Sequence, residues 1–274
     1  MCNKYNFQCR TIDNLPPAQA VDAMRNLGSQ GVNLIIASSN GYSDQLIQAA
    51  REFPNTWFVM TSDLPSTQGL PNVVAFVWNW YQFGWLGGVA AGYLTKTGKT
   101  GYVLGAPLLA AQQAMEGFRQ GAQIGHPGTQ VTFRLINSFN DAVAAREASQ
   151  AMISAGVDVL TGIAGGANPG IIQASQSSRV SYIGYLADEY STAPGSIPTS
   201  MVGNVAKEYD DLGRLYSSHQ LQAKLYVGTV QDGTISLAQL RDIPADTASK
   251  IQQQVANLKD GKITIDETKL FPLQ

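Results

Sequence analysis

The sequence is poor in the residues that build metal centres and disulfide frameworks. Its 274 residues include two histidines, His126 and His219, and two cysteines, Cys2 and Cys9. The histidines are far apart and have no metal-ligand spacing, so we expect no transition-metal site. Two cysteines cannot form a framework of several disulfides. We expect them to be ordinary thiols, with a lipoprotein anchor at Cys2 as the alternative.

Charge and long apolar runs are also scarce. Only 14% of the residues are charged and the formal net charge is −2, which gives no field to attract nucleic acid or anionic membranes. No run approaches the roughly 18 apolar residues that a membrane-spanning helix needs. The sequence has no G-x-S-x-G motif and no serine with a plausible histidine partner. We therefore expect no enzymatic activity, no cofactor and no nucleic-acid partner.

An internal repeat is the most informative feature that the chain does have. Residues 20–63 recur at 145–188 with a constant offset of 125 positions and no gap, and ten of the aligned positions are identical. Self-similarity at this long period predicts two like lobes rather than a solenoid. A cleft between two lobes is a common place for a small ligand. The repeat therefore predicts a small-molecule binding protein.

Each copy is predicted to consist of helix, strand, loop, helix and strand. Helical spacing covers 17–29 and 142–155, and the apolar runs 32–37, 57–63, 157–164 and 182–188 are typical of buried strands. Gly31 and Gly156 are expected to end the first helices with positive φ. Alternating strands and helices indicate βαβ units, in which ligands bind beyond the carboxyl ends of the strands. Asn40, Asp63, Gly165 and Asp188 occupy those places.

The two copies differ in what precedes them. A strand at 99–106, a helix at about 109–124 and a strand at 131–137 are predicted before the second copy, but only a strand at 5–12 before the first. We therefore expect the first lobe to lack a strand and a helix, about 35 residues by the usual size of a βα unit. A secretory signal would also lie in that segment.

Several motifs, in the same order along the chain, resemble the basic membrane protein family. They are GVNLIIASSNGYSD (31–44), FPNTWFVMTSD (53–63), the segment from Trp78 to Gly105, INSFNDAVAAREAS (136–149) and GVDVLTGIAGGANPGIIQAS (156–175). The resemblance implies a substrate-binding protein of an ABC-type uptake system for purine nucleosides. It implies two Rossmann-like α/β lobes with parallel sheets and a hinge of several crossovers, as in type I periplasmic binding proteins.

The same resemblance implies the surroundings of the protein. A membrane permease and an ATPase would be its partners, the protein would be extracytoplasmic, either periplasmic or lipid-anchored, and we expect a monomer. The first lobe is predicted to comprise residues 1–98 plus about 203–222, and the second 99–202 plus about 223–274. Within these bounds, the strand around 225–230 is expected to belong to the second lobe.

Aromatic residues near the predicted cleft are candidates for stacking on a purine ring. Trp80 and Tyr81 stand where a strand passes into a helix, and Tyr42 and Phe139 lie in matching loops of the two lobes. The alternative for each is ordinary packing or an exposed loop position. We expect Trp78 and Trp85 to be packing residues.

Glycines and acids complete the predicted site. Gly165 and Gly166 would let backbone N–H groups approach a ligand, while GIAGGANPG (162–170) lacks the Lys-Ser/Thr of a phosphate-binding P-loop. Asp63 either contacts the ligand or caps the turn that follows it. The resemblance aligns Leu186 and Asp188 with the two acids of a Val-Asp-x-Asp-Gln segment, so Leu186 replaces the acid expected on the ribose. This favours a nucleobase over a nucleoside in the interlobe cleft. The alternative function is a two-lobed small-molecule sensor or regulatory protein not coupled to transport.

Overall fold

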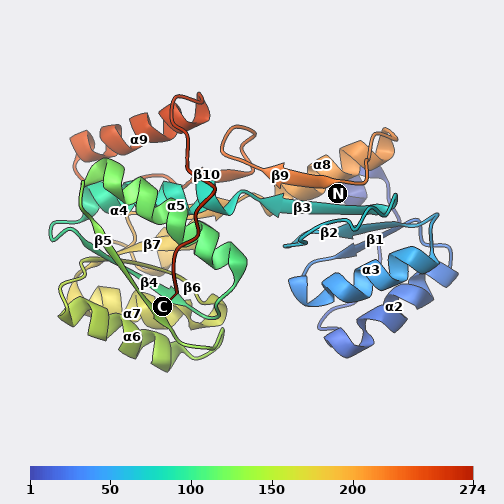
Figure 1. Cartoon of the computed structure of the whole chain (residues 1–274), viewed down its shortest axis with the longest axis horizontal. Helices are drawn as coiled ribbons and strands as arrows, with labels where there is room; N and C mark the ends of the chain where they lie inside the picture. The colour runs from blue at the N-terminus through green and yellow to red at the C-terminus, as the bar shows by residue number, and fades with distance from the viewer. Residues whose placement is uncertain (274) are drawn as a thin grey trace. The chain divides into compact units, whose positions relative to one another are not determined.

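The computed structural model describes residues 1–273, except for the side chain of Asn40. The chain forms two compact units, each assembled from segments distant in sequence (Figure 1). The first unit contains Met1–Trp78 and Asn204–Gly228, and the second contains Asn79–Gly203 and Thr229–Gln274. This agrees with the predicted α/β class and with the prediction that the chain crosses more than once between two lobes.

The first unit is a parallel sheet with helices on both faces. Its strands are β1 (Leu34–Ala37), β2 (Trp57–Met60), β3 (Val73–Trp78) and β9 (Leu225–Gly228), in the order β1-β2-β3-β9. Helices α2 (Pro17–Ser29) and α3 (Ser43–Glu52) cover one face, and α8 (Val205–Ser217) covers the other (Figure 1). The 3-10 turn η1 (Asn40–Tyr42) leads into α3.

Alternation along the first unit's strands explains its two hydrophobic clusters. Ile35 and Phe58 belong to the cluster shared with α2 and α3. The intervening residues Ile36 and Val59 point to the opposite face and pack with Leu212 of α8. Successive side chains of a strand point to opposite faces of a sheet, so this continuous apolar sequence serves a sheet that is covered on both sides.

The second unit is a larger doubly covered sheet, with strand order β10-β8-β7-β6-β4-β5. The strands are β4 (Lys99–Leu104), β5 (Gln130–Leu135), β6 (Val159–Ile163), β7 (Ser181–Leu186), β8 (Thr199–Gly203) and β10 (Ile235–Leu237), of which β10 is antiparallel to β8. The helices are α4 (Trp80–Leu94), α5 (Leu109–Gly125), α6 (Ala142–Ser154), α7 (Asn168–Ser178) and α9 (Ala245–Lys259). Short 3-10 turns, η2 (Gly165–Ala167) and η3 (Tyr190–Thr192), follow β6 and β7.

Helices α4 and α5 pack with their backbones in close contact. A Cβ atom on Gly84 would lie 1.8 Å from the carbonyl oxygen of Ala114, and one on Gly88 would lie 2.1 Å from that of Phe118. On α5, a Cβ atom on Gly117 would lie 2.0 Å from the carbonyl oxygen of Tyr81. Only glycine fits at such distances, which explains the glycine spacing in this part of the sequence.

The predicted repeat is confirmed over most of its length. Helix α6 begins and ends 125 positions after α2, and η2 lies 125 positions after η1. Gly31 and Gly156 follow these helices with φ of 77° and 95°. The strands that close the two copies depart from the offset, because Leu34 pairs with Trp57 but Val159 pairs with Ser181.

This slip changes which residues correspond in the two units. Val159 lies 125 positions after Leu34, whereas Ser181 lies 124 positions after Trp57. A shift of one residue moves every side chain of a strand to the other face. Thr61 therefore corresponds in space to Tyr185, and the expected equivalence of Asp63 and Asp188 is wrong by one residue.

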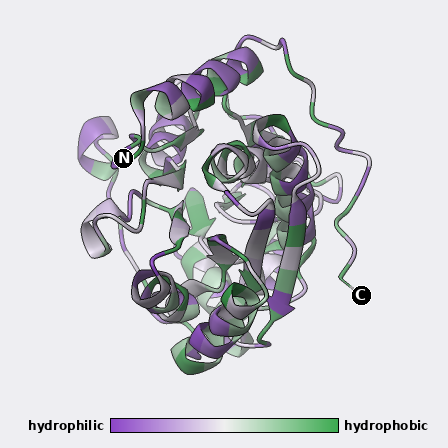
Figure 2. Ribbon diagram, turned by 90° about the vertical axis from the view of Figure 1, so that its left-hand side faces the viewer, coloured by the Kyte–Doolittle hydropathy of each residue, from purple (hydrophilic) through white to green (hydrophobic). Residues whose placement is uncertain are grey.

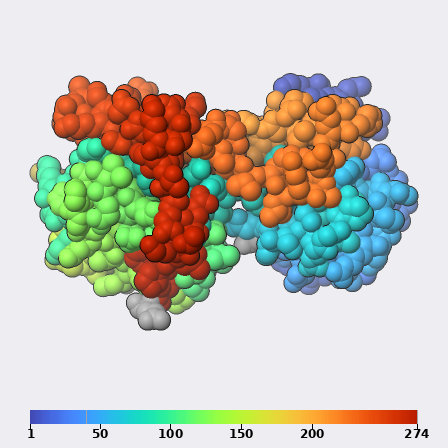
Figure 3. Space-filling view, turned by 45° about the horizontal axis from the view of Figure 1, so that its top comes forward, coloured from blue at the N-terminus to red at the C-terminus, as the bar shows by residue number. Residues whose placement is uncertain are grey.

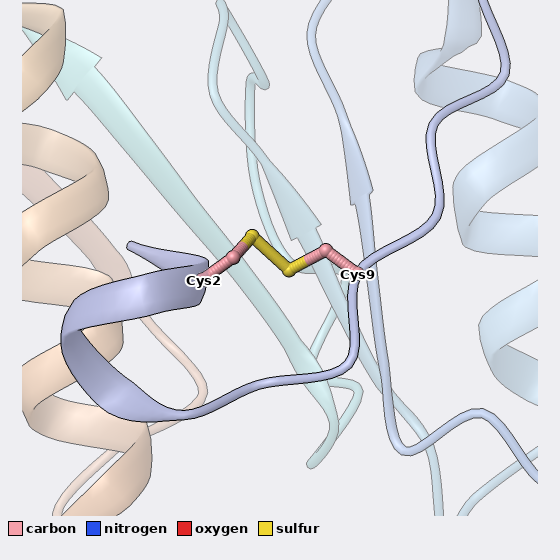
Figure 4. Close-up of a disulfide and its surroundings, with 2 residues drawn as sticks. All are labelled: Cys2 and Cys9. Carbon is pink, nitrogen blue, oxygen red and sulfur yellow. A yellow bond between two sulfur atoms is a disulfide. The ribbon is translucent and has the colours of Figure 1, made fainter.

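The N-terminal segment corrects two predictions. Residues 5–12 do not form a strand, since the short helix α1 (Cys2–Tyr5) is followed by irregular chain. The cysteines are not free thiols, because Cys2 and Cys9 form a disulfide with a Cα–Cα distance of 6.0 Å (Figure 4). Seven extended residues would span about 23 Å, so the segment from Cys2 to Cys9 must turn back on itself. Lys4 of α1 forms an ion pair with Asp210 of α8 at 2.6 Å.

Two segments lie in a different unit from the one predicted. Helix α4 packs along α5 in the second unit, so the compact units divide after Trp78 rather than near residue 98. Strand β9 pairs in parallel with β3 in the first unit, whereas the sequence placed it in the second lobe. Where the lobes part during closure stays a prediction.

The C-terminal segment fastens the helices of the second unit. Helix α9 is mostly hydrophilic (Figure 2) and buries Ile251 and Leu258. After it, the chain crosses the surface of α5 (Figure 3), where Gln120 and the backbone of Asp266 exchange two hydrogen bonds of 2.9 Å. Within the described residues, no helix has both the length and the apolar character needed to cross a membrane.

Candidate ligand-binding residues

The carboxyl edge of the second unit's sheet holds an aromatic ring on a glycine surface. Phe139 follows β5 and is 38% exposed. A Cβ atom on Gly105, just after β4, would lie 2.5 Å from the Phe139 ring, and one on Gly165 would lie 3.5 Å from it. Gly165 has φ of 53°, a conformation that favours glycine. The structure thus brings together Phe139, Gly165 and Gly166 of the predicted site, and adds Gly105.

Leu186 ends β7 on the same edge in an unusual backbone conformation. Its φ is 70° and the residue is 40% exposed, so the side chain is not part of the core. The loop that follows β7 folds back onto this strand, because Glu189 accepts a hydrogen bond of 2.8 Å from the Tyr185 N–H. Left-handed conformations of non-glycine residues are uncommon and are enriched at functional sites.

Asp188 forms an ion pair with Arg241, a residue that was not predicted to belong to the site. The Arg241 guanidinium donates to both carboxylate oxygens, at 3.0 and 2.8 Å, and stacks over the Tyr190 ring at 4.7 Å. This guanidinium, together with the Tyr190 N–H, holds the pKa of Asp188 below its ordinary value. The carboxylate is therefore charged at neutral pH and already carries a strong bidentate partner.

Trp80 and Tyr81 both lie in the first turn of α4, which Asn79 caps by accepting from the Gln82 N–H at 3.0 Å. Trp80 packs edge-to-face on Phe83, with ring centroids 5.4 Å apart. Tyr81 is 7% exposed and donates a hydrogen bond of 2.9 Å to the Lys269 carbonyl oxygen. The hydroxyl of Tyr81 thus anchors the C-terminal segment.

The predicted residues of the first unit lie around η1. Tyr42 packs against the core next to α2 and α3, and its hydroxyl donates to the Leu15 carbonyl oxygen at 2.6 Å. The Asp63 carbonyl oxygen accepts a hydrogen bond from Ser43 at 3.5 Å. The side chain of Asn40 lies outside the described part of the chain.

Three hydroxyl groups that were not predicted meet at the carboxyl edge of the first unit. Ser38 directly follows β1, Thr61 directly follows β2, and Tyr209 lies in α8. The Ser38 Oγ atom is 2.9 Å from Thr61 Oγ1 and 2.8 Å from the Tyr209 hydroxyl oxygen, and Thr61 Oγ1 is 3.5 Å from the latter. We call these three residues the hydroxyl triad.

The sequence carried a signal for two members of the triad. Ile36 and Val59 face α8, and the period-2 alternation of strands puts Ser38 and Thr61 on that same face. A polar residue after each of two neighbouring parallel strands marks an edge where ligands bind. Nothing local indicates Tyr209, which is 171 positions from Ser38.

A buried acid lies on the same helix as Tyr209. Glu208 is 5% exposed, and its carboxylate accepts a hydrogen bond from the Trp78 indole N–H. This contact joins the carboxyl end of β3 to the first turn of α8 and supports the expectation that Trp78 is a packing residue. Among residues 1–273, no group of three or more histidine, cysteine, aspartate or glutamate side chains is placed to hold a metal ion.

Comparison with known families matches almost the whole chain. Residues 3–269 match the Bmp family, described as ABC transporter substrate-binding protein, PnrA-like. A purine-binding protein of Brucella abortus is 24% identical over 246 residues, which cover 90% of this chain and 69% of the relative. An ABC transporter nucleoside-binding protein of Lactococcus lactis is 25% identical, covering 86% and 72%. The transcriptional activator protein med of Bacillus subtilis is 24% identical, covering 85% and 74%.

Solved structures share the fold. A transcriptional activator of the comK gene from Bacillus halodurans has a TM-score of 0.81 at 22% identity, covering 91% of this chain and 86% of that one. An ABC transporter solute-binding protein from Conexibacter woesei has a TM-score of 0.78 at 20% identity, covering 97% and 90%. These similarities establish the two-lobed α/β fold of periplasmic binding proteins.

Proposed function

Because this chain belongs to the Bmp family of ABC transporter substrate-binding proteins, we propose that it binds a purine for an uptake system, with a nucleobase preferred over a nucleoside. Family membership makes the protein a non-catalytic solute-binding component. The names of the relatives from Brucella abortus and Lactococcus lactis support a purine or nucleoside as the ligand.

The exposed ring of Phe139 above Gly105 is the observation that carries the proposal. A purine presents a flat π face, and offset aromatic stacking contributes about 0.5–1.5 kcal/mol beyond the burial of area. Because neither Gly105 nor Gly165 has a side chain, the ring lies directly on the backbone at this edge. Such a surface suits a planar heterocycle.

Leu186 supports the preference for a nucleobase. Its exposed side chain at the end of β7 has no hydrogen-bonding group for a sugar. A ribose hydroxyl buried against leucine would lose its partner, at a cost of about 1–3 kcal/mol for each unsatisfied group. A bare base avoids this cost.

The partners and location follow from the same proposal. A membrane permease with an ATPase would receive the ligand from the closed lobes, and hinge closure around the ligand is the expected motion. We place the protein outside the cytoplasm and expect a monomer; the disulfide argues against the lipid anchor predicted at Cys2, because a disulfide-bonded thiol cannot carry a lipid. The Cys2–Cys9 disulfide supports this location, because disulfides persist in oxidising compartments.

Calorimetry of adenine and adenosine with the wild type and Leu186→Asp tests the function and the preference together. We expect adenine to bind the wild type about tenfold or more tightly than adenosine, because two lost hydroxyl contacts cost about 1 kcal/mol each. The aspartate should restore adenosine binding. Equal wild-type affinities would refute the preference, and the absence of any purine binding would refute the function.

The names of two relatives favour a sensor as the second candidate. Both the med protein and the Bacillus halodurans structure are described as transcriptional activators. A sensor would use the same two lobes to pass ligand binding to a regulatory partner, without a permease. Purine uptake by cells with and without the gene distinguishes the candidates, because loss of uptake on deletion supports transport and unchanged uptake supports the sensor.

A further inference from the structure

We propose that the hydroxyl triad Ser38–Thr61–Tyr209 recognises the polar rim of the ligand and accepts 6-amino and 6-oxo purines alike. This inference rests on the proposed function, since it names the side chains of the first unit that bind the purine and the class of purine that they accept. The triad lies wholly within the first unit, at the carboxyl ends of the neighbouring strands β1 and β2. That is the edge at which open parallel sheets bind ligands.

The triad lies where the two strands leave the apolar core of the first unit. Ile36 and Val59 precede Ser38 and Thr61 by two positions and belong to the apolar cluster with α8. Ser38 is exposed and Thr61 is half-buried, so the strands become polar where they leave this cluster. In the second unit the position equivalent to Ser38 is Ile163, which is 8% exposed. The first unit instead has a polar group, and Ser38 is exposed to solvent.

The triad also has hydrogen-bonding capacity to spare. Each hydroxyl carries one proton and two acceptor lone pairs. The two short contacts, 2.9 Å from Ser38 to Thr61 and 2.8 Å from Ser38 to Tyr209, use two of the three protons and two of the six lone pairs. The third contact, from Thr61 to Tyr209, is 3.5 Å long. A ligand that displaces this long contact would find one donor and several acceptors.

Rotation of the hydroxyls determines the expected specificity. In adenine the 6-amino group donates and N1 accepts, whereas in hypoxanthine the 6-oxo group accepts and N1–H donates. A hydroxyl can turn to donate or to accept, so linked hydroxyls can reverse their direction together. A carboxylate only accepts hydrogen bonds and an ammonium group only donates them, so either group would favour one of the two purines. The triad should therefore bind both purines with similar affinity.

The test is calorimetry of adenine and hypoxanthine with the full chain and four variants. We expect wild-type dissociation constants within about threefold of each other. Ser38→Ala, Thr61→Val and Tyr209→Phe should each weaken both purines by about three- to tenfold, the usual net effect of one hydrogen bond. Tyr216→Phe, which removes a hydroxyl from the same helix away from the triad, should leave both affinities unchanged. Circular dichroism melting confirms that each variant folds, and exposed Ser38 is the safest of the three sites.

The possible outcomes separate this inference from the proposed function. Wild-type purine binding that none of the three variants alters overturns the role of the triad and leaves the function in place. A wild-type preference above about thirtyfold for one purine overturns the tolerance for both. If the wild type binds neither purine, the function fails and the inference fails with it. Equal weakening of both purines by the triad variants alone supports the inference.

Discussion

The two sheets present different chemistry at the same topological place. At its carboxyl edge the first unit offers the hydroxyl triad, with a buried indole–carboxylate contact nearby. The second unit offers Phe139 on a glycine surface and the exposed Leu186. The two units thus share a framework but differ in the side chains that follow their strands. These are hydroxyl groups in the first unit, whereas Phe139 and Leu186 are apolar in the second.

The units also differ in how they are held together. The second depends on backbone contact between α4 and α5 through glycines. Helices α2 and α3 of the first unit have no comparable series of glycine contacts. Its N-terminal segment is held by a disulfide and by the Lys4–Asp210 ion pair. Substitutions in one unit should therefore leave the other largely unaffected.

The largest effect is expected at the glycine contact of the second unit. Gly88→Ala would put a Cβ atom 2.1 Å from the Phe118 carbonyl oxygen, and we expect the free energy of unfolding to fall by about 3 kcal/mol. Gly41→Ala in the first unit is the control, because its Cβ atom would meet Ser39 Oγ at 3.5 Å, an ordinary contact. Hydrogen exchange should show faster opening in the second unit for the first variant only.

Removing the disulfide should weaken the first unit alone. The double variant Cys2→Ser, Cys9→Ser loses the cross-link over a separation of seven residues. The chain-entropy relation gives a loss of about 2 kcal/mol for so short a loop. Hydrogen exchange of α1 and α8 should increase while that of α4 and α5 stays the same. Equal increases in both units would contradict the independence of the two.

Phe139→Ala tests the apolar edge of the second unit. Loss of the stacked ring should weaken adenine binding about tenfold, since stacking and area burial disappear together. Val143→Ala serves as the control, because this neighbouring α6 residue is 58% exposed and lies outside the glycine surface. An unchanged adenine affinity in Phe139→Ala would remove the ring from the site.

The smallest effect is expected from the Asp188–Arg241 pair. Hydrogen bonding to Arg241 lowers the pKa of Asp188 in the folded protein, so its contribution is present above the unfolded pKa of about 3.9 and lost as the pH falls through the folded pKa. The Asp188 side chain is 40% exposed, so screening limits the contribution to less than about 1 kcal/mol. Asp188→Asn should be slightly less stable than the wild type at pH 7. Urea unfolding from pH 7 to pH 2 should show this difference shrinking toward zero.

The sequence by itself determined the order of the elements and most of their bounds. Apolar runs and helical spacing are local signals, and they placed α2 at Pro17–Ser29 and α6 within one residue of its end. The repeat predicted two similar units. The glycine that follows the first helix of each copy predicted a backbone position with positive φ. The proximity of Phe139 to the Gly165–Gly166 turn follows from the same signals, because loops that follow parallel strands meet at one edge of the sheet. Their contact with a ligand stays a prediction.

Only the tertiary structure decided the contacts between distant segments. Tyr209 reaches Ser38 across 171 positions and Arg241 reaches Asp188 across 53, and no local pattern specifies either partner. The one-residue slip at β7 depends on strand pairing, which a gapless sequence alignment does not reveal. The disulfide required α1 to turn the chain back toward Cys2. Periodicity records which face of an element is buried, whereas the choice of partner depends on how whole elements pack.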